Sequence, residues 1–145
     1  MAAKSLVWKG AEVTARMRAA QIAGVNATMG TCVIDAKSSH AWQNRTGILE
    51  GSLGIADYAK VEGDGVVGSW GSQDVRYALI HELGGTIVPK RAKALAIPQA
   101  DGSVRFAKSV TIPPRPYLRP AADRHYPELA QTIRAAYAKS GGGDE

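Results

Sequence analysis

Cysteine and phenylalanine are almost absent from this sequence, with one residue of each among 145. The single cysteine, Cys32, excludes a disulfide within the chain and favours synthesis in a reducing compartment. Because no histidine lies at a telling spacing from it, we interpret Cys32 as a small buried helix residue rather than a nucleophile. Aromatic residues make up only 6% of the chain, so that Ala, Val, Ile and Leu must supply much of the core.

Long apolar runs are also lacking. No stretch of about 18 apolar residues occurs, which excludes an obvious membrane span. The N-terminal stretch MAAKSLVWKGAEVTARMR carries charge too often for the core of a signal peptide. We therefore expect a soluble protein, not secreted by the usual route and without membrane contact, whose length fits one domain.

The motifs of metal and nucleotide sites are incomplete or missing. His81 and Glu82 begin the zinc-protease pattern H-E-x-x-H, but Gly85 stands where the second histidine is needed. The remaining histidines, His40 and His125, lie far away in the sequence, and no glycine-rich phosphate loop is present. A hydrolase built on His81 and Glu82 would lack a third group. We predict that the chain is not an enzyme and needs no cofactor or metal.

Residues 3–39 predict a long N-terminal helix, because apolar residues recur every seven positions at Leu6, Val13, Ala20 and Ala27. Gly24 and Gly30 weaken this pattern, and we expect a bend or break near one of them. The small residues of this helix would let a sheet or a neighbouring subunit approach closely: Ala19, Ala20, Ala23 and Gly24.

A glycine-rich stretch from Thr46 to Trp70 predicts strands around a turn at the sequence GDG. It opens a predicted sheet region, 46–118, which also contains a short central helix. The apolar spacing of that helix ends at HELGG, where Gly84 or Gly85 supplies a left-handed cap. Its apolar positions are Val75, Ala78, Leu79 and Leu83.

Two short extended pieces, a polar turn at QADGS and a returning strand at VRFAKSVTI predict a β-hairpin from Pro89 to Ile112, which we call the arm. The rigid PPRPYLRP follows, and then a C-terminal helix, 120–139, that kinks or restarts at Pro127. Residues 141–145 predict a flexible tail. The fold class is therefore α+β, with a long N-terminal helix, a small antiparallel sheet with a projecting arm, and short central and C-terminal helices in one domain, 1–140.

The net charge of +5 is concentrated in the second half of the chain, where nine basic residues face three acidic ones between Arg76 and Arg124. Lys90, Arg91 and Lys93 lie together, without the interleaved aromatic residues of a single-strand nucleic-acid binder. A solvated loop and an interaction surface both remain open for this cluster. Two interpretations of the arm likewise remain open. It is either a hairpin with a purely structural role, or a projecting element whose edges pair with another chain.

Several motifs occur together and in order: RTGILEGSL, YALIHELGGTIVPKRAKALAIP and FAKSVTIPPRPYLRPA. They resemble the signature of the phage virion-morphogenesis, or tail completion, family of Mu-like phages, which is related to small head-tail joining proteins. The first motif is similar to a strand of that wider group. The resemblance covers Thr46 to Ala121 and leaves the N-terminal helix unmatched.

The resemblance implies a structural virion protein of the tailed-phage neck, a homo-oligomeric ring, six- or twelve-fold, around the DNA channel at the head-tail interface. Its partners would be a head-tail connector, tail terminator or tail tube protein, and DNA would pass without sequence-specific binding. The protein would reside in the virion, and in the host cytoplasm during assembly. The alternative is a small basic nucleic-acid-binding protein, which predicts salt-sensitive DNA binding by the monomer.

Carried over by position, the resemblance gives two sets of residues. The first would hold the fold at the helix end and the return of the arm: Tyr77, His81, Gly84, Gly85, Thr86, Pro113, Pro114, Arg115, Pro116 and Tyr117. The second, in the arm, would contact other subunits or partners: Pro89, Lys90, Arg91, Lys93, Leu95, Ile97, Val104, Phe106, Lys108, Val110 and Ile112. For the basic cluster, we favour a protein surface over DNA, because strong phosphate contacts would hinder sliding DNA.

Overall fold

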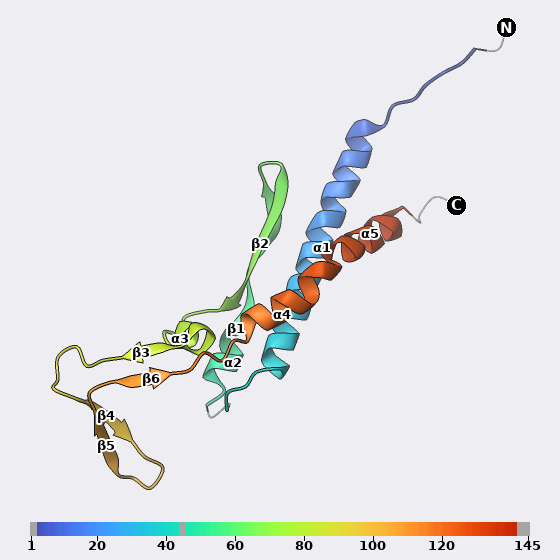
Figure 1. The fold of residues 1–145 in the computed structure, drawn as a ribbon. Helices are drawn as coiled ribbons and strands as arrows, with labels where there is room; N and C mark the ends of the chain where they lie inside the picture. Colours follow the sequence, from blue (N-terminus) through green and yellow to red (C-terminus); the bar gives the residue numbers. More distant parts are fainter. Residues whose placement is uncertain (1–2, 44–45, 142–145) are drawn as a thin grey trace.

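The computed structural model describes residues 3–43 and 46–141. Helices and strands are mixed, and the strands form three separate two-stranded antiparallel sheets, so the predicted α+β class is confirmed. A long helix forms the axis of the molecule, a β-hairpin lies along it, and a thin extension projects from its lower end (Figure 1). No helix in the described part of the chain has both the length and the apolar character of a membrane span.

The long helix α1 spans Gly10–Ser38 without interruption. The expectation of a helix from residue 3 was wrong, because residues 3–9 are extended and Leu6 is 92% exposed, so that nothing packs against them. The expected break at Gly24 or Gly30 is also absent. At Gly24 the reason is tertiary: a Cβ there would lie 2.5 Å from Ile133 Cγ1, so the glycine allows the C-terminal helix to approach.

The predicted strand region begins with a helix instead, which corrects the expectation for the first motif. Gly47 has a φ of 72° and starts the short helix α2, Ile48–Ser52, whose Leu49 is buried. Ser52 then donates a hydrogen bond to the Leu49 carbonyl and contacts the Ser72 hydroxyl, which fixes the change from helix to strand. The strands β1, Leu53–Glu62, and β2, Gly65–Ser72, follow as an antiparallel pair around the predicted GDG turn.

The core lies where the lower half of α1 meets the start of β1 and the C-terminal helices. Its buried residues come from segments far apart in the sequence and include the predicted buried thiol of Cys32: Cys32, Ala36, Trp42, Leu49, Leu53, Ala78, Tyr117 and Ala121. Trp42 and Tyr117 provide most of the aromatic area, with ring centroids 4.6 Å apart. A chain with few aromatic residues therefore places two of them at the centre of its core.

The C-terminal helix is divided as Pro127 predicts. It consists of α4, Leu118–His125, a 3-10 turn at Tyr126–Glu128, and α5, Leu129–Ser140, so it starts two residues before the predicted boundary. Arg16 of α1 holds the end of α5, because its guanidinium donates to the Tyr137 carbonyl at 2.7 Å and lies over the Tyr137 ring. Apart from Gly141, the predicted flexible tail lies outside the described residues.

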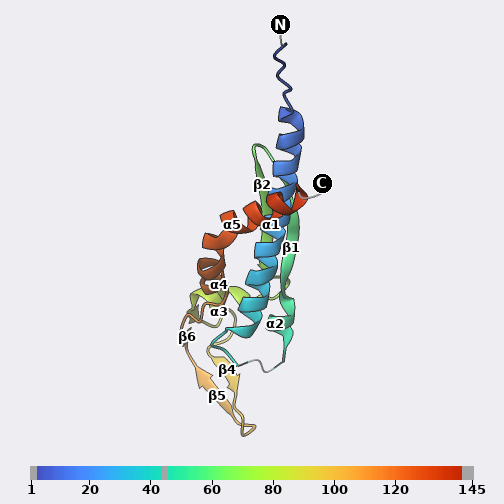
Figure 2. The same ribbon diagram turned by 90° about the vertical axis from the view of Figure 1, so that its right-hand side faces the viewer.

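The central helix α3, Ala78–Leu83, leads into the extension through β3, Gly85–Ile87. The arm then contains β4, Leu95–Pro98, β5, Val104–Ala107, and β6, Val110–Ile112. The single returning strand expected at residues 104–112 is broken at Lys108 and Ser109, and β5 pairs with β4 whereas β6 pairs with β3. The extension, residues 85–112, therefore consists of two successive ribbons, the first formed by β3 and β6 and the second by β4 and β5. It lies at the end of the molecule away from the N-terminus (Figure 2).

Candidate subunit interface and its root

The arm leaves the body and returns to it at one place, which we call the root and define as residues 77–84 and 113–117. At its entry, Gly84 ends α3 with the expected positive φ, 69°, but its ψ of −179° differs from that of the expected left-handed cap; Gly85 does not have a positive φ. A Cβ on Gly84 would lie 2.7 Å from Pro114 N and 2.8 Å from Ile112 O. Gly84 is thus required both by its own backbone and by the returning strand packed against it.

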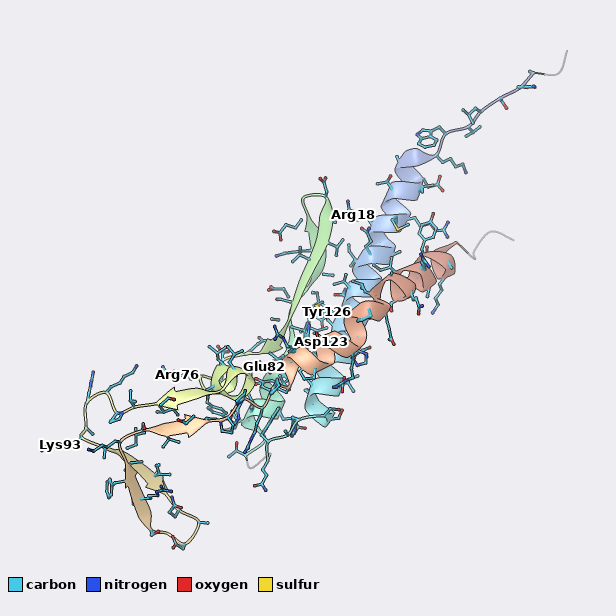
Figure 3. The ribbon with its side chains drawn as sticks, viewed as in Figure 1. Arg18, Arg76, Glu82, Lys93, Asp123 and Tyr126 are labelled. Carbon is cyan, nitrogen blue, oxygen red and sulfur yellow. The ribbon has the colours of Figure 1, made fainter. Side chains whose placement is uncertain are left out.

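Glu82 joins the two sides of the root (Figure 3). Its carboxylate accepts hydrogen bonds from the backbone N–H groups of Tyr117 at 2.7 Å, Leu118 at 3.0 Å and Arg119 at 2.9 Å. N–H groups at the start of a helix have no acceptor within the helix itself, and the helix dipole favours a negative charge there. Glu82 supplies both to α4. In the sequence, Glu82 stands out only as part of the incomplete zinc motif, because its hydrogen-bond partners lie 35 or more residues away in the chain.

His81 contributes its backbone and its ring to the same joint. Its carbonyl accepts a hydrogen bond from Arg115 N at 2.8 Å, which pairs the end of α3 with the proline-rich return. The ring lies between Tyr77 and Trp42, with centroid distances of 5.7 and 6.1 Å. Its Nδ1 is buried and has no hydrogen-bond partner among the described residues.

Tyr117 anchors the return of the arm in the core. It is 1% exposed, and its hydroxyl donates to the Ala78 carbonyl at 3.3 Å, so it connects the chain after the arm with the helix before it. Burial raises the pKa of Tyr117 above its ordinary value, and the nearby Glu82 carboxylate raises it further. The phenol is therefore a neutral hydrogen-bond donor at physiological pH.

The root also borders an open cleft of about 680 Å³. Its lining includes Trp42, Tyr77, His81 and Arg115. The carboxylate next to His81 accepts hydrogen bonds from three backbone N–H groups, so both of its oxygens are engaged in holding the root. Within the described ranges, no three His, Cys, Asp or Glu side chains are close enough together to hold a metal ion.

The extension itself has no core. Every residue from 85 to 112 is described, and none of them is buried. Thr86 and Thr111 are paired across the first ribbon, with their hydroxyl oxygens 3.3 Å apart. Ile87 is paired with Val110 at the end of this ribbon, next to the break.

The second ribbon presents an apolar face to solvent. Ala96 is paired with Phe106 and Pro98 with Val104, and residues paired across an antiparallel ladder share a face. All four are exposed, with Phe106 at 70% and Val104 at 51%. The opposite face carries Leu95 and Ile97, which are only half-buried.

The basic arm residues are spread over both parts of the extension. Lys90, Arg91 and Lys93 lie in the loop between β3 and β4, and Figure 3 shows Lys93 at the outer bend. Arg105 is in β5, and Lys108 is in the break between β5 and β6. All five side chains are exposed, and none has an acidic partner among the described residues.

The structure thus brings Tyr77, His81, Gly84, Arg115 and Tyr117 together at the root and places the predicted contact residues on the arm. One signal in the sequence could have identified Glu82. The later helix α4 begins without a capping Ser, Thr, Asp or Asn, so its first N–H groups need an acceptor from elsewhere. Glu82, a carboxylate close to the glycine that ends α3, can supply that acceptor. Comparison with protein-family models, curated proteins and solved structures finds no match to this chain.

Proposed function

We propose that the chain is a structural protein of the tailed-phage neck, a tail completion or head-tail joining protein. Copies of it form a ring around the DNA channel at the head-tail interface, and the arm makes contacts between subunits or with an adjoining ring. Connector, tail terminator or tail tube proteins are the neighbours. The chain acts as an assembly element without a catalytic step, first in the host cytoplasm and then in the virion.

The observation that carries this proposal is an extension without buried residues that is held on a well-packed root. The face formed by Ala96, Pro98, Val104 and Phe106 exposes apolar area that the body of the same chain does not cover. A two-stranded ribbon is marginally stable alone, and its open edges invite pairing with another chain. The root, by contrast, fixes where the extension starts and ends, as a contact element in a ring requires.

Removing the outer part of the arm tests the proposal. Because Ile87 and Val110 are paired, residues 88–109 can be replaced by an Asn-Gly turn that keeps the first ribbon and the root. We expect this variant to remain folded, with an unchanged melting temperature, because none of the deleted residues is buried. In the phage that encodes the chain, we expect lysates with full heads and separate tails, counted by electron microscopy.

A variant with the arm intact but with Ser103→Ala at its polar tip serves as the control and should give normal particles. The proposal fails if the shortened chain still supports infectious particles at normal yield. If the shortened chain unfolds instead, the arm contributes to the body and its assignment as a contact element must be abandoned.

The second candidate, a nucleic-acid-binding protein, is favoured by one observation. Five basic residues of the arm are exposed and form no ion pair with any acidic residue that the structure describes, while Asp101 is the only acidic residue in the sequence between Pro89 and Ile112. Such a protein would bind duplex DNA as a monomer, with an affinity that falls steeply as salt increases. Fluorescence anisotropy with labelled DNA at rising NaCl concentration separates the two candidates.

A further inference from the structure

The β1–β2 hairpin carries the opposite charge to the arm. Asp57, Glu62 and Asp64 are exposed on it, against one basic residue, Lys60. None of these three carboxylates forms an ion pair among the described residues. The arm has five basic residues and one acidic one, likewise without ion pairs. The two projecting elements of this chain are therefore electrostatically complementary.

Both elements also expose apolar side chains next to their charges. On the hairpin, Tyr58 is 68% exposed, and Val67, which shares a face with its ladder partner Lys60, is 47% exposed. On the arm, Phe106 and Val104 form part of the exposed face described above. Contact between the two elements would bury apolar area next to charged groups, as protein interfaces do.

The arm cannot reach the hairpin of its own chain. In both views the hairpin tip lies beside the N-terminal half of α1, whereas the arm projects beyond the opposite end of that helix (Figures 1 and 2). The tip is also held to the body, because Arg18 donates to the Asp64 carbonyl at 3.1 Å. Further along, Asn26 accepts from Ala59 N at 2.8 Å. The hairpin is thus a fixed surface on α1, and an arm that meets it must come from another copy of the chain.

We propose that the basic arm of one copy docks on the acidic β1–β2 hairpin of a second copy. This inference rests on the proposed function and specifies the surface that the arm contacts. Two different surfaces of the same chain meet in this interface, so each copy has one free arm and one free hairpin to continue the assembly. Such head-to-tail contacts close into a ring when the rotation between copies divides a full turn.

Charge reversal on each side tests the contact. The arm variant carries Lys90→Glu, Arg91→Glu and Lys93→Glu, and the hairpin variant carries Glu62→Lys and Asp64→Lys, all at exposed positions. We expect each variant alone to associate at least about 10-fold more weakly than wild type in analytical ultracentrifugation, because several attractive pairs become repulsive. Wild-type association should weaken as NaCl is raised.

The decisive measurement is a mixture of the two variants. The reversed arm of the first fits the reversed hairpin of the second, and the unchanged arm of the second fits the unchanged hairpin of the first. An equimolar mixture should therefore assemble to the wild-type size, and so should one chain that carries all five changes. Circular dichroism melting of each variant serves as the control for folding.

The outcomes distinguish this inference from the proposed function. If each reversal prevents assembly and the mixture does not restore it, the arm binds elsewhere and the inference is overturned, while the neck function stands. If neither reversal changes association, or if the wild type stays monomeric at every concentration, docking between copies is overturned. Failure of the neck function itself would appear in the arm-shortened phage as normal joining of heads and tails.

Discussion

The two adjacent glycines that follow α3, Gly84 and Gly85, have different physical roles. Gly84 has a positive φ and would force a Cβ against Pro114 and Ile112, whereas a Cβ on Gly85 would meet only Ile80 at 3.5 Å, an ordinary contact. The sequence pattern HELGG predicted that one of the two caps the helix but did not identify which. That choice depends on the returning strand, which lies almost thirty residues further along the chain.

We expect Gly84→Ala to lower the free energy of unfolding by about 2 kcal/mol or more, from backbone strain and the clash with the return of the arm. Gly85→Ala is the matched control and should change it by less than about 0.5 kcal/mol. Urea unfolding followed by circular dichroism measures both. Equal stability of the two variants would mean that the root does not have the described geometry.

The joint between α1 and α4 depends on one carboxylate. Asp35 Oδ2 lies 2.7 Å from Arg124 Nε and 2.9 Å from His125 Nε2. The hydrogen bond from Arg124 holds the pKa of Asp35 well below its ordinary value, although burial acts to raise it, and Ser39 and His125 add to the lowering. Because the folded pKa is below the unfolded one, this group stabilises the fold above the unfolded pKa, and the stabilisation is lost as pH falls through the folded pKa.

Asp35→Asn should therefore reduce the free energy of unfolding by about 1 kcal/mol at pH 7. As the pH falls below about 4, the wild type should begin to lose this advantage, so that the difference is smaller at pH 3 than at pH 7. Asp123→Asn, an exposed change on α4, serves as the control. Urea unfolding at pH 7 and at pH 3 tests the prediction, and a difference that is equal at both values would contradict it.

At the scale of elements, local patterns predicted most of what the backbone does by itself. The long helix, the GDG turn, the restart at Pro127 and the projecting hairpin were all expected from spacing and turn residues. The predictions were wrong where tertiary contacts determine the extent of a helix. Helix α1 continues through Gly24 because Ile133 packs there, and it starts only at Gly10 because nothing covers the residues before it.

The same holds for the candidate interface. The arm and its residues were predicted, since hairpin chemistry is local. Glu82 was missed as the residue that closes the root, since its three N–H partners come from a segment beyond the arm. The division of the returning strand at Lys108 and Ser109 was missed too, because β5 and β6 choose different partners and no single sequence shows that choice.

At the scale of the whole molecule, stability should be unevenly distributed. The body holds the buried cluster around Trp42 and Tyr117, whereas the loop at Lys90, Arg91 and Lys93 is exposed and without buried neighbours in the chain. Such segments open at a low free-energy cost and are cut first by proteases. Assembly would cover the arm and slow the cleavage.

Trypsin can trim the exposed N-terminal segment at Lys4 and Lys9. Within the folded part of the monomer, we expect limited digestion to cut first between Lys90 and Lys93, with the body surviving as two fragments held together. Mass spectrometry of the early products identifies the site, and the arm-shortened variant, which lacks these residues, provides the comparison. At concentrations where copies associate, the rate of this cut should fall. Earlier cleavage at Arg16 or Arg134, on the packed α1 and α5 helices, would contradict this distribution of stability.

Because the root holds both ends of the arm together, the arm can be replaced without changing the body. Three contacts join the chain before the arm to the chain after it: Gly84 packs against Pro114, Arg115 N donates to the His81 carbonyl, and Glu82 accepts from Tyr117 N. The body therefore imposes only one condition on residues 88–109, which is that their two ends lie close together. Insertions, deletions or a foreign hairpin at this point leave every buried residue in place. Under the proposed function, partner choice could therefore diverge independently of the fold, because one continuous stretch of sequence would carry the contacts with neighbours.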